Sequence, residues 1–371
     1  MGDRIPVLDL DAQLAPMREE ILAAVDRCLG HKGFCLGREV EAFEEAYAEY
    51  HGVKHGVGVN SGTSALHLAA RLLELGPGDE VITTPMTFVA TAWAIDYVGA
   101  KPVFVDIEAD TMNMDMNRLE AALTPRTKAV FAVHLFGQPC DLGPVRTFCE
   151  ENGLALVEDA AQAHGAEYEG HRVGGDGRMS IFSFYPGKNL GACGEGGIML
   201  TNEDRLAERA RALRNHGSEK RYYHEEVGYN YRMEGIQAAI LGLKLRHLDE
   251  WTEERRRVAG KYHDGLEGTP LRLPVEREGR KSVYHLYVVR HSRRDELAAY
   301  LGDEGIGTGL HYPVPLHLQK SFSGLGYRAG DFPEAERMAE ECLSLPMYPE
   351  LRNDQVERVC GAIVKFFRDG V

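Results

Sequence analysis

The sequence predicts an α/β protein built on a mostly parallel sheet that helices cover on both faces. Segments typical of strands and helices alternate from residue 79 to residue 158, which is the pattern of βα units. After residue 200 the chain becomes mainly helical and ends in a smaller α+β unit. With 371 residues, of which 44% are hydrophobic, it is long enough for two domains, and we expect them at 1–245 and 246–371.

The expected elements follow from hydrophobic periodicity and from turn residues. In the first half we expect helices at 11–29, 38–50, 63–75, 87–97, 116–123 and 141–152, and strands before residue 60 and at 79–83, 102–105, 128–135 and 154–157. In the second half we expect an apolar strand at 181–184, helices at 204–215, 234–265, 293–304, 334–343 and 353–368, and a strand at 284–290.

Composition excludes several classes of function. The net charge of -15 argues against nucleic acid or an anionic membrane as the main partner. The seven cysteines are scattered without a C-x-x-C pair, which indicates neither a zinc site nor a disulfide framework, and we expect no metal. The first residues lack the pattern of a signal peptide, and no apolar run reaches the ~18 residues of a membrane span. A cytoplasmic location is therefore expected.

One lysine stands in unusual surroundings. Lys188 follows the apolar strand at 181–184 and lies in a loop that carries five glycines between residues 187 and 197. Glycines let another group approach the backbone closely, and partial desolvation lowers the pKa of a lysine so that its neutral amine can react with a carbonyl. Taken alone, the pattern also suits an ordinary solvated loop lysine.

Two further segments are candidate sites at the carboxyl edge of the sheet, where ligands bind in such folds. The turn at 60–64 presents backbone N–H groups and hydroxyls at a helix N-terminus, which suits a phosphate or ordinary N-capping by Ser61 or Thr63. Asp159 lies at the tip of the strand predicted at 154–157. There its carboxylate could face a protonated ring nitrogen or act as a helix N-cap. Phe88, at another strand edge, suits ring stacking or the core.

Nucleotide motifs do not account for these glycines. Gly56 and Gly58 lack the third glycine of the dinucleotide fingerprint, because Ser61 stands there. Lys188 lacks the P-loop context, because Phe182 replaces the first glycine and Asn189 replaces the Ser or Thr. The anion cradle, the strand-tip acid, the aromatic face and the lysine together are instead the set that pyridoxal 5'-phosphate requires.

The sequence resembles the DegT/DnrJ/EryC1/StrS aminotransferases over nearly its whole length. The motifs that carry the resemblance lie at residues 60–66, 85–91, 157–162, 183–191, 229–233 and 311–313. The resemblance implies the aspartate-aminotransferase-like fold (fold type I of the pyridoxal-phosphate enzymes), with a seven-stranded sheet in the large cofactor-binding domain and a smaller C-terminal domain. It also implies a homodimer with shared active sites.

The resemblance also implies site residues. Lys188 and Asp159 are the implied catalytic residues: Lys188 forms the internal aldimine and moves protons, and Asp159 keeps the pyridinium nitrogen charged. The implied cofactor-binding residues are Gly62, Thr63, Phe88, Asp159, Gln162, Ser183, Lys188 and, reaching the phosphate of the neighbouring subunit, Asn230. The candidate substrate contacts are Tyr185, His216, Lys220, Arg221, His311 and Tyr312.

The implied reaction is a ping-pong transfer of an amino group in amino-sugar biosynthesis. The implied donor is L-glutamate, and the implied acceptor is a nucleotide-linked keto-sugar, aminated at ring carbon 3 of a dTDP- or UDP-sugar. Two alternatives stay open: a transaminase of the same fold that acts on a keto-cyclitol or on a simple ketone or aldehyde, and a non-catalytic regulator that binds the cofactor.

Overall fold

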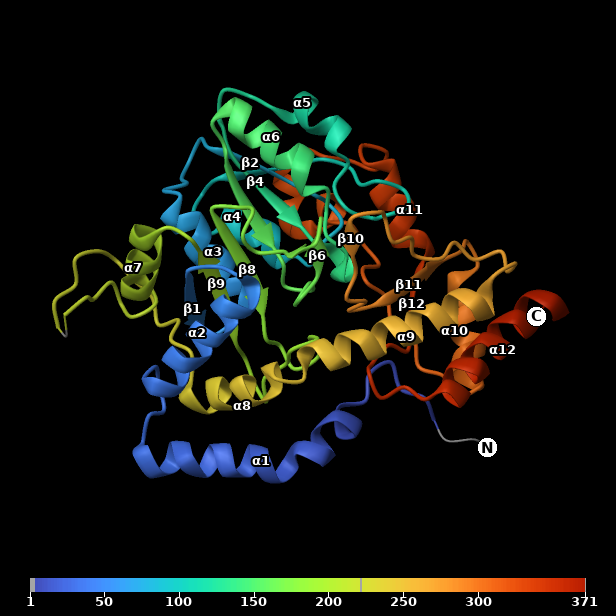
Figure 1. The fold of residues 1–371 in the computed structure, drawn as a ribbon. Helices are drawn as coiled ribbons and strands as arrows, with labels where there is room; N and C mark the ends of the chain where they lie inside the picture. The colour runs from blue at the N-terminus through green and yellow to red at the C-terminus, as the bar shows by residue number, and fades with distance from the viewer. Residues whose placement is uncertain (1–3, 221, 371) are drawn as a thin grey trace.

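A seven-stranded sheet with strand order β1-β9-β8-β5-β4-β2-β3 lies at the centre of the protein (Figure 1). The computed structural model describes residues 4–220 and 222–370. The strands are β1 (His55–Val59), β2 (Glu80–Thr83), β3 (Lys101–Phe104), β4 (Thr127–Val133), β5 (Ala155–Asp159), β8 (Met179–Ser183) and β9 (Gly197–Thr201). Strand β9 runs antiparallel to both its neighbours, and the other pairs are parallel. The predicted mostly parallel seven-stranded sheet is confirmed.

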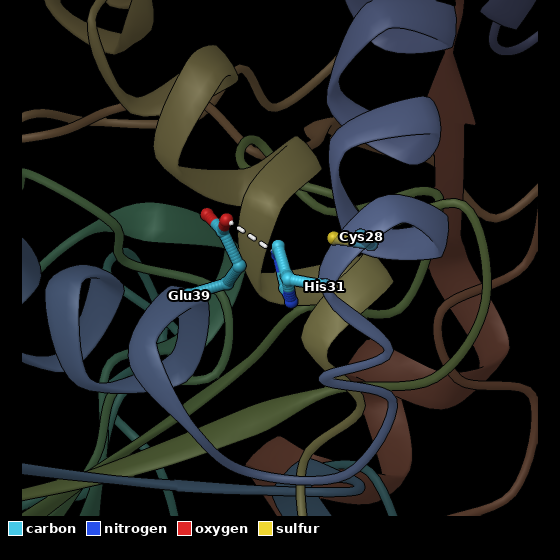
Figure 2. Close-up of side chains that lie close together, drawn as sticks. All are labelled: Cys28, His31 and Glu39. Atoms are coloured by element: carbon cyan, nitrogen blue, oxygen red, sulfur yellow. Dashed lines mark hydrogen bonds and ion pairs between the residues drawn. The ribbon is translucent and has the colours of Figure 1, made fainter.

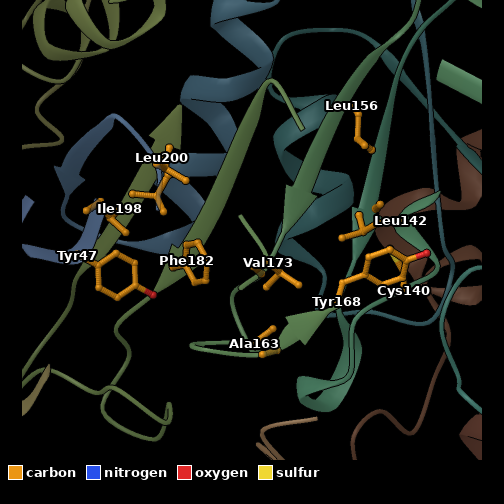
Figure 3. Packing of buried hydrophobic residues seen from close by; sticks show 14 of the residues in the cluster. Tyr47, Cys140, Leu142, Leu156, Ala163, Tyr168, Val173, Phe182, Ile198 and Leu200 are labelled. Carbon is orange, nitrogen blue, oxygen red and sulfur yellow. The ribbon is translucent and has the colours of Figure 1, made fainter. Parts of the chain in front are cut away.

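Helices cover both faces of this sheet, and each face has its own buried cluster. On one face pack α2 (Arg38–His51), α5 (Leu119–Ala122), α6 (Leu142–Asn152) and α8 (Gly235–Leu245). On the other face pack α3 (Gly62–Leu72), α4 (Ala90–Asp96) and α7 (Asp204–Leu213). Figure 3 shows part of the first cluster, in which Tyr47 of α2 lies near Phe182 of β8. The two-layered cover leaves only the ends of the strands available for a ligand.

The local sequence explains which face of α2 is buried and where this helix ends. In α2, the buried residues Val40, Phe43 and Tyr47 recur at helical spacing and face the sheet. The helix ends at Gly52, which has a φ of 67° that glycine adopts without strain. The preceding helix, α1 (Leu10–His31), packs along α8 at the periphery of the protein (Figure 1).

The C-terminal part forms a further hydrophobic cluster beside the sheet. Helix α11 (Pro333–Glu341) packs separately, with Phe104 and Val133 of the large sheet. The elements of the C-terminal cluster are α9 (Leu248–Leu266), β11 (Tyr287–Arg290), α10 (Arg294–Asp303), β12 (Cys342–Leu345) and α12 (Asn353–Asp369). Ile5 packs into this cluster and bridges to Ile306, so the start of the chain joins the C-terminal unit. The division between residues 245 and 246 stays a prediction.

Short elements complete the described chain. Strands β6 (Glu167–Tyr168), β7 (His171–Arg172) and β10 (Arg280–Lys281) form a small sheet. The 3-10 helices are η1 (Met116–Arg118), η2 (Leu135–Gly137), η3 (Leu316–Leu318) and η4 (Lys320–Leu325). None of the helices in the described ranges combines the length and the apolar character that crossing a membrane requires.

Tertiary contacts overturn several predicted boundaries. The predicted helix at 234–265 is wrong: α8 and α9 are separate helices, because the chain turns at Arg246 and His247 where it leaves the sheet. The predicted helix at 334–343 extends too far: Cys342–Leu345 is strand β12, which pairs with β11. Strand β11 starts at residue 287 instead of the predicted 284. Tyr284 has a φ of 42°, which lies outside the strand region.

The remaining differences concern two short helices. The helix predicted at 87–97 is only Ala90–Asp96, so Phe88 precedes it. The helix predicted at 116–123 is a 3-10 turn followed by a single α-helical turn. In both places the apolar periodicity predicts one continuous α-helix, whereas only part of each range is α-helical.

A buried carboxylate holds the loop between β7 and β8 against the sheet. Glu158 of β5 is fully buried and accepts hydrogen bonds from the N–H groups of Gly174, Asp176 and Gly177 and from His134 Nε2, at 2.8 to 3.1 Å. Burial alone would raise the pKa of Glu158, but these hydrogen bonds outweigh it and lower the pKa below its ordinary value. The charged form of Glu158 therefore stabilises the folded state.

We predict that Glu158→Gln lowers the free energy of unfolding by about 3 kcal/mol, because the amide nitrogen of Gln cannot accept from the N–H donors that bond one of the two carboxylate oxygens. The wild-type contribution is present above the ordinary pKa of about 4.3 and is lost as the pH falls below it. Urea unfolding between pH 7 and pH 3 measures both effects. The control is Glu203→Gln, which breaks an exposed pair with Arg178 and should cost under about 1 kcal/mol. Equal losses in the two variants contradict the prediction.

Candidate functional site

A cavity of about 580 Å³ lies at the carboxyl ends of β4, β5 and β8. Residues that follow the strands or begin α3 line one side of it: Gly62, Thr63, Thr87, Phe88, Thr91, Val133, Asp159, Gln162, Ser183 and Lys188. The other side comes from the chain start and from the C-terminal unit: Val7, Leu8, His285, Leu286, His311, Tyr312 and Met347. The cavity thus lies where the sheet meets the C-terminal unit.

Lys188 lies in this cavity as its buried amine. Its backbone N–H donates to the carbonyl of Tyr185 at 2.8 Å, which forms the turn after β8. Burial lowers the pKa of Lys188 to about 8, and the negative charge of Asp159 opposes this shift. At pH 7 roughly a tenth of Lys188 is therefore uncharged and able to react with a carbonyl, far more than for an ordinary lysine.

The glycine loop after Lys188 is held by a second buried lysine. A Cβ atom at Gly191 would collide with the carbonyl oxygen of Pro186, so this position requires glycine. Lys244, only 1% exposed at the end of α8, donates from Nζ to the carbonyl of Gly191 at 2.6 Å. Sequence analysis missed Lys244, because it reads as one of many charged residues in a long helix.

Asp159 is the last residue of β5 and is 5% exposed. Its Oδ2 accepts from the Thr91 hydroxyl at 2.7 Å and its Oδ1 accepts from the Ala161 N–H at 3.2 Å. Burial raises the pKa of Asp159, while these hydrogen bonds and Lys188 oppose the shift. No helix begins at residues 160–163 of the described chain, so the N-cap alternative for Asp159 is wrong.

The N-terminus of α3 combines capping with an open anion site. Ser61 Oγ accepts the Ser64 N–H at 3.0 Å, so the predicted cap is present. The N–H groups of Gly62 and Thr63 have no partner among the described residues. A Cβ atom at Gly62 would lie 2.7 Å from the Cβ of Ser183, so glycine lets the helix end and the Ser183 segment meet. Free N–H groups at a helix N-terminus favour a phosphate.

Two buried side chains, Tyr47 and His164, hold the backbone of Ser183 through hydrogen bonds. The Tyr47 hydroxyl donates to His164 Nδ1 at 2.6 Å, and His164 Nε2 donates to the Ser183 carbonyl at 2.9 Å. Burial lowers the pKa of His164 to about 3, so the ring is neutral and a single tautomer satisfies both bonds. Tyr47 lies more than a hundred residues away in the sequence, and no local pattern connects it with Ser183.

Phe88, Gln162 and Tyr312 contribute aromatic and amide groups to the lining of the cavity. Phe88 is 52% exposed and its ring centroid lies 6.1 Å from that of Tyr312. Gln162 accepts the Phe136 N–H at 2.7 Å and donates to the Tyr312 hydroxyl at 3.1 Å. Burial raises the pKa of Tyr312 to about 12, so its hydroxyl remains a hydrogen-bond donor. Phe88 is thus not a core residue, and its face is available to a flat ligand.

The structure separates the candidate substrate contacts into distinct groups. Tyr185, His311 and Tyr312 line the cavity. His216, which contacts Arg232, and Lys220 do not line the cavity of their own chain. Arg221 lies outside the described residues. Asn230 is exposed and also does not line the cavity of its own chain.

A separate cluster of potential metal ligands lies at the end of α1. Figure 2 shows His31 between Glu39 and Cys28, whose ligand atoms lie within 4.8 Å of one another. His31 Nε2 bonds Glu39 at 3.1 Å, His31 Nδ1 accepts the Gly33 N–H, and the Cys28 thiol donates to the Gly235 carbonyl. Because each side chain already has a protein partner, we assign the cluster to the packing of α1 against α2 and α8.

The donor set in the cavity fits pyridoxal phosphate. A carbonyl-reactive amine, a carboxylate for the ring nitrogen and an exposed aromatic face are present in Lys188, Asp159 and Phe88. The N–H groups of Gly62 and Thr63, which have no partner among the described residues, would hold the phosphate. This test of fit depends only on residues that line one cavity.

Comparisons with known proteins agree with this fit. A model of the DegT/DnrJ/EryC1/StrS aminotransferase family matches residues 16–364. A "Pleiotropic regulatory protein" of Geobacillus stearothermophilus is 47% identical over 98% of this chain and 99% of its own. A "dTDP-3-amino-3,4,6-trideoxy-alpha-D-glucose transaminase" of Streptomyces venezuelae is 46% identical over 97% of this chain and 95% of its own. A "UDP-N-acetyl-3-dehydro-alpha-D-glucosamine 3-aminotranferase" of Acidithiobacillus ferrooxidans is 45% identical over 97% of each chain.

Solved structures extend the similarity to the fold. S. venezuelae DesV, in complex with a ketimine intermediate, has a TM-score of 0.97 and 46% identity, covering 98% of this chain and 99% of its own. Bacillus subtilis ntda, with bound cofactor PMP, has a TM-score of 0.91 and 27% identity, covering 99% of this chain and 86% of its own. The similarity includes the C-terminal unit as well as the sheet.

The electrostatic coupling of Lys188 to Asp159 leads to a prediction for the protein without cofactor. Asp159→Asn removes the negative charge that favours protonated Lys188, so the pKa of Lys188 falls below about 8. The rate of reductive methylation of Lys188 at pH 7 should then rise about tenfold. Peptide mass spectrometry over a pH series measures it, with exposed Lys128 as the internal reference. An unchanged pH profile for Lys188 contradicts the coupling.

Proposed function

The chain belongs to the DegT/DnrJ/EryC1/StrS aminotransferase family, and on this premise we propose that its acceptor substrate is a nucleotide-linked keto-sugar. It is a pyridoxal-phosphate-dependent aminotransferase. The proposed donor is L-glutamate, and the proposed acceptor carbon is ring carbon 3 of a dTDP- or UDP-sugar. Support for the acceptor comes from the names of the S. venezuelae and A. ferrooxidans relatives.

The observation that carries the proposal is the joint placement of Lys188, Asp159 and the N-terminus of α3 around one cavity. We assign the cofactor's aldehyde to Lys188, its ring nitrogen to Asp159 and its phosphate to Gly62, Thr63 and Ser183. We assign one ring face to Phe88 and the ring hydroxyl to Gln162. When bound, pyridoxal phosphate supplies an electron sink for the carbon that exchanges its proton.

Lys188 is also the proposed proton carrier. Its pKa of about 8 makes the amine both an acceptor and a donor of protons near neutral pH. In the donor half-reaction Lys188 would take the proton from the α-carbon of the amino acid, and in the acceptor half-reaction Lys188 would donate a proton to the sugar carbon that receives the amino group. Asp159 would stay charged beside the protonated ring nitrogen of the cofactor. The hydrogen bond from Thr91 holds its carboxylate in place.

The mouth of the cavity supports a large polar acceptor. Tyr185 is 56% exposed beside Lys188, and His311 and Tyr312 line the side formed by the C-terminal unit. We assign these three side chains to the sugar. The roles predicted for His216, Lys220 and Arg221 remain proposals for a nucleotide that extends beyond the cavity.

Two half-reactions test the function. L-glutamate should convert the yellow cofactor form to the colourless amine form, and a dTDP- or UDP-3-keto-sugar should restore the colour. Lys188→Ala should lower both rates by at least about 10³-fold, whereas exposed Lys54→Ala should leave them unchanged. Borohydride reduction and peptide mapping should place the cofactor on Lys188.

Each alternative function has its own outcome in this test. No colour change with any amino donor indicates a regulator that only binds the cofactor, the role suggested by the name of the G. stearothermophilus relative. Restoration of colour by keto-inositol or by simple ketones, and not by keto-sugars, indicates the cyclitol or ketone transaminase. Either result overturns the proposed substrate.

We also propose a homodimer with shared sites. Asn230 is exposed and lies on a segment with Tyr223 and Val227, which are 60% and 79% exposed. Large exposed apolar side chains of this kind are typical of an interface. In the dimer, Asn230 of one subunit is proposed to reach the phosphate held by the other. We also propose that the boundary between the two domains lies between residues 245 and 246. A cytoplasmic location is proposed as well, because it suits the seven free cysteines.

The shared site predicts complementation between inactive subunits. Asn230→Ala should weaken cofactor binding about tenfold. When the Asn230→Ala and Lys188→Ala chains are unfolded together and refolded as a mixture, hybrid dimers should restore about a quarter of the wild-type sites. Absorbance titration with the cofactor counts them. No restoration in a mixture that refolds to dimers would mean that each site is built from one chain.

A further inference from the structure

His285 lies in the cavity but has no role in the reaction described so far. It comes from the segment before β11 and lines the side formed by the C-terminal unit, with Met347 and His311. Its partner is Asn189, the residue directly after Lys188, whose Oδ1 lies 3.1 Å from His285 Nδ1. The contact joins the lysine loop to the C-terminal unit.

A backbone carbonyl determines how this pair is protonated. Asn189 is 2% exposed, and its Nδ2 donates to the Val283 carbonyl at 3.0 Å. Because a carbonyl can only accept, the amide orientation is set, and Asn189 Oδ1 must face His285. An amide oxygen also only accepts, so the proton of the neutral imidazole is on Nδ1, and Nε2 carries a lone pair.

The surroundings keep the imidazole neutral. Burial lowers the pKa of His285 well below its ordinary value, and the charge of Lys188, that of Arg255 and the rings of His311 and His164 act in the same direction. Arg255 also donates to the His285 carbonyl at 3.3 Å and so holds the backbone. Nε2 makes no hydrogen bond with the described residues and is not among their fully buried unpaired atoms. Because His285 lines the cavity, its Nε2 is an acceptor without a protein donor at that lining.

We propose that His285 is a specificity residue whose Nε2 accepts a hydrogen bond from a hydroxyl group of the incoming keto-sugar. This inference rests on the proposed function. His285 lines the same cavity as Tyr312 and His311, the side chains assigned to the sugar, and as Gly62 and Thr63 of the anion site. A hydroxylated acceptor supplies the missing donor, whereas a plain ketone leaves the lone pair unsatisfied, which disfavours it.

Two substitutions separate the two ring nitrogens. His285→Asn keeps a donor at the position of Nδ1 for Asn189 and removes the acceptor in the cavity. His285→Gln keeps an acceptor at the position of Nε2 and loses the contact with Asn189. We expect His285→Asn to raise the apparent Kd of the dTDP- or UDP-3-keto-sugar in the acceptor half-reaction by about 10- to 100-fold. The rate with L-glutamate and the affinity for dTDP or UDP alone should change less than about twofold, and His285→Gln should retain most of the sugar affinity.

The outcomes that overturn the inference differ from failure of the proposed function. A wild-type Kd for the keto-sugar in His285→Asn overturns the inference. Equal slowing of both half-reactions also overturns it, because Lys188 would then be the group that His285 contacts. If the wild-type enzyme reacts with L-glutamate but with no keto-sugar, the proposed function fails and the inference falls with it. That result is recognised in the wild-type protein, before any variant is compared.

Discussion

The burial of Lys188 beside Asp159 is the constraint on which the rest of the site depends. Burial disfavours the charge of both groups: it lowers the pKa of Lys188 to about 8 and raises that of Asp159. Each charge supports the other, so neither can be moved without changing its partner. The sheet brings Lys188 and Asp159 together because β5 and β8 are adjacent and parallel. The segments that follow these two strands therefore leave the sheet at the same edge. The hydrogen bond from Thr91 then holds the carboxylate at that edge.

The lysine loop is held from two directions, and this explains why the cavity spans both units. Lys244 of α8 holds the carbonyl of Gly191 from the side of the sheet. Asn189 contacts His285 and the Val283 carbonyl on the side of the C-terminal unit. The break between α8 and α9 serves the same arrangement, because it ends α8 where Lys244 meets the loop and lets α9 cross to the C-terminal unit (Figure 1). A relative displacement of the units would therefore alter the position of Lys188.

Local patterns in the sequence predicted much of the fold and part of the site. The alternation at 79–158 predicted the parallel sheet, and Ser61 predicted the start of α3, because periodicity and capping act within a few residues. The helix predicted at 334–343 includes Cys342 and Leu343, which belong to strand β12, because the pairing of β12 with β11 depends on a segment about fifty residues away. His216 is a predicted substrate contact by its position in the family and Lys220 by its charge in a polar segment, and neither signal says whether a side chain faces the cavity.

The sequence by itself determined the reactive groups: a lysine among glycines, an acid at a strand tip and a helix N-terminus with free N–H groups. These depend on residue type and short spacing, which do not change when the chain folds. Only the tertiary structure decided their protonation and their surroundings. The lowered pKa of Lys188, the neutral ring of His164 and the free acceptor of His285 all arise from burial and from partners distant in sequence. Desolvation and hydrogen-bond direction are properties of packed neighbours, so no single segment could have revealed them.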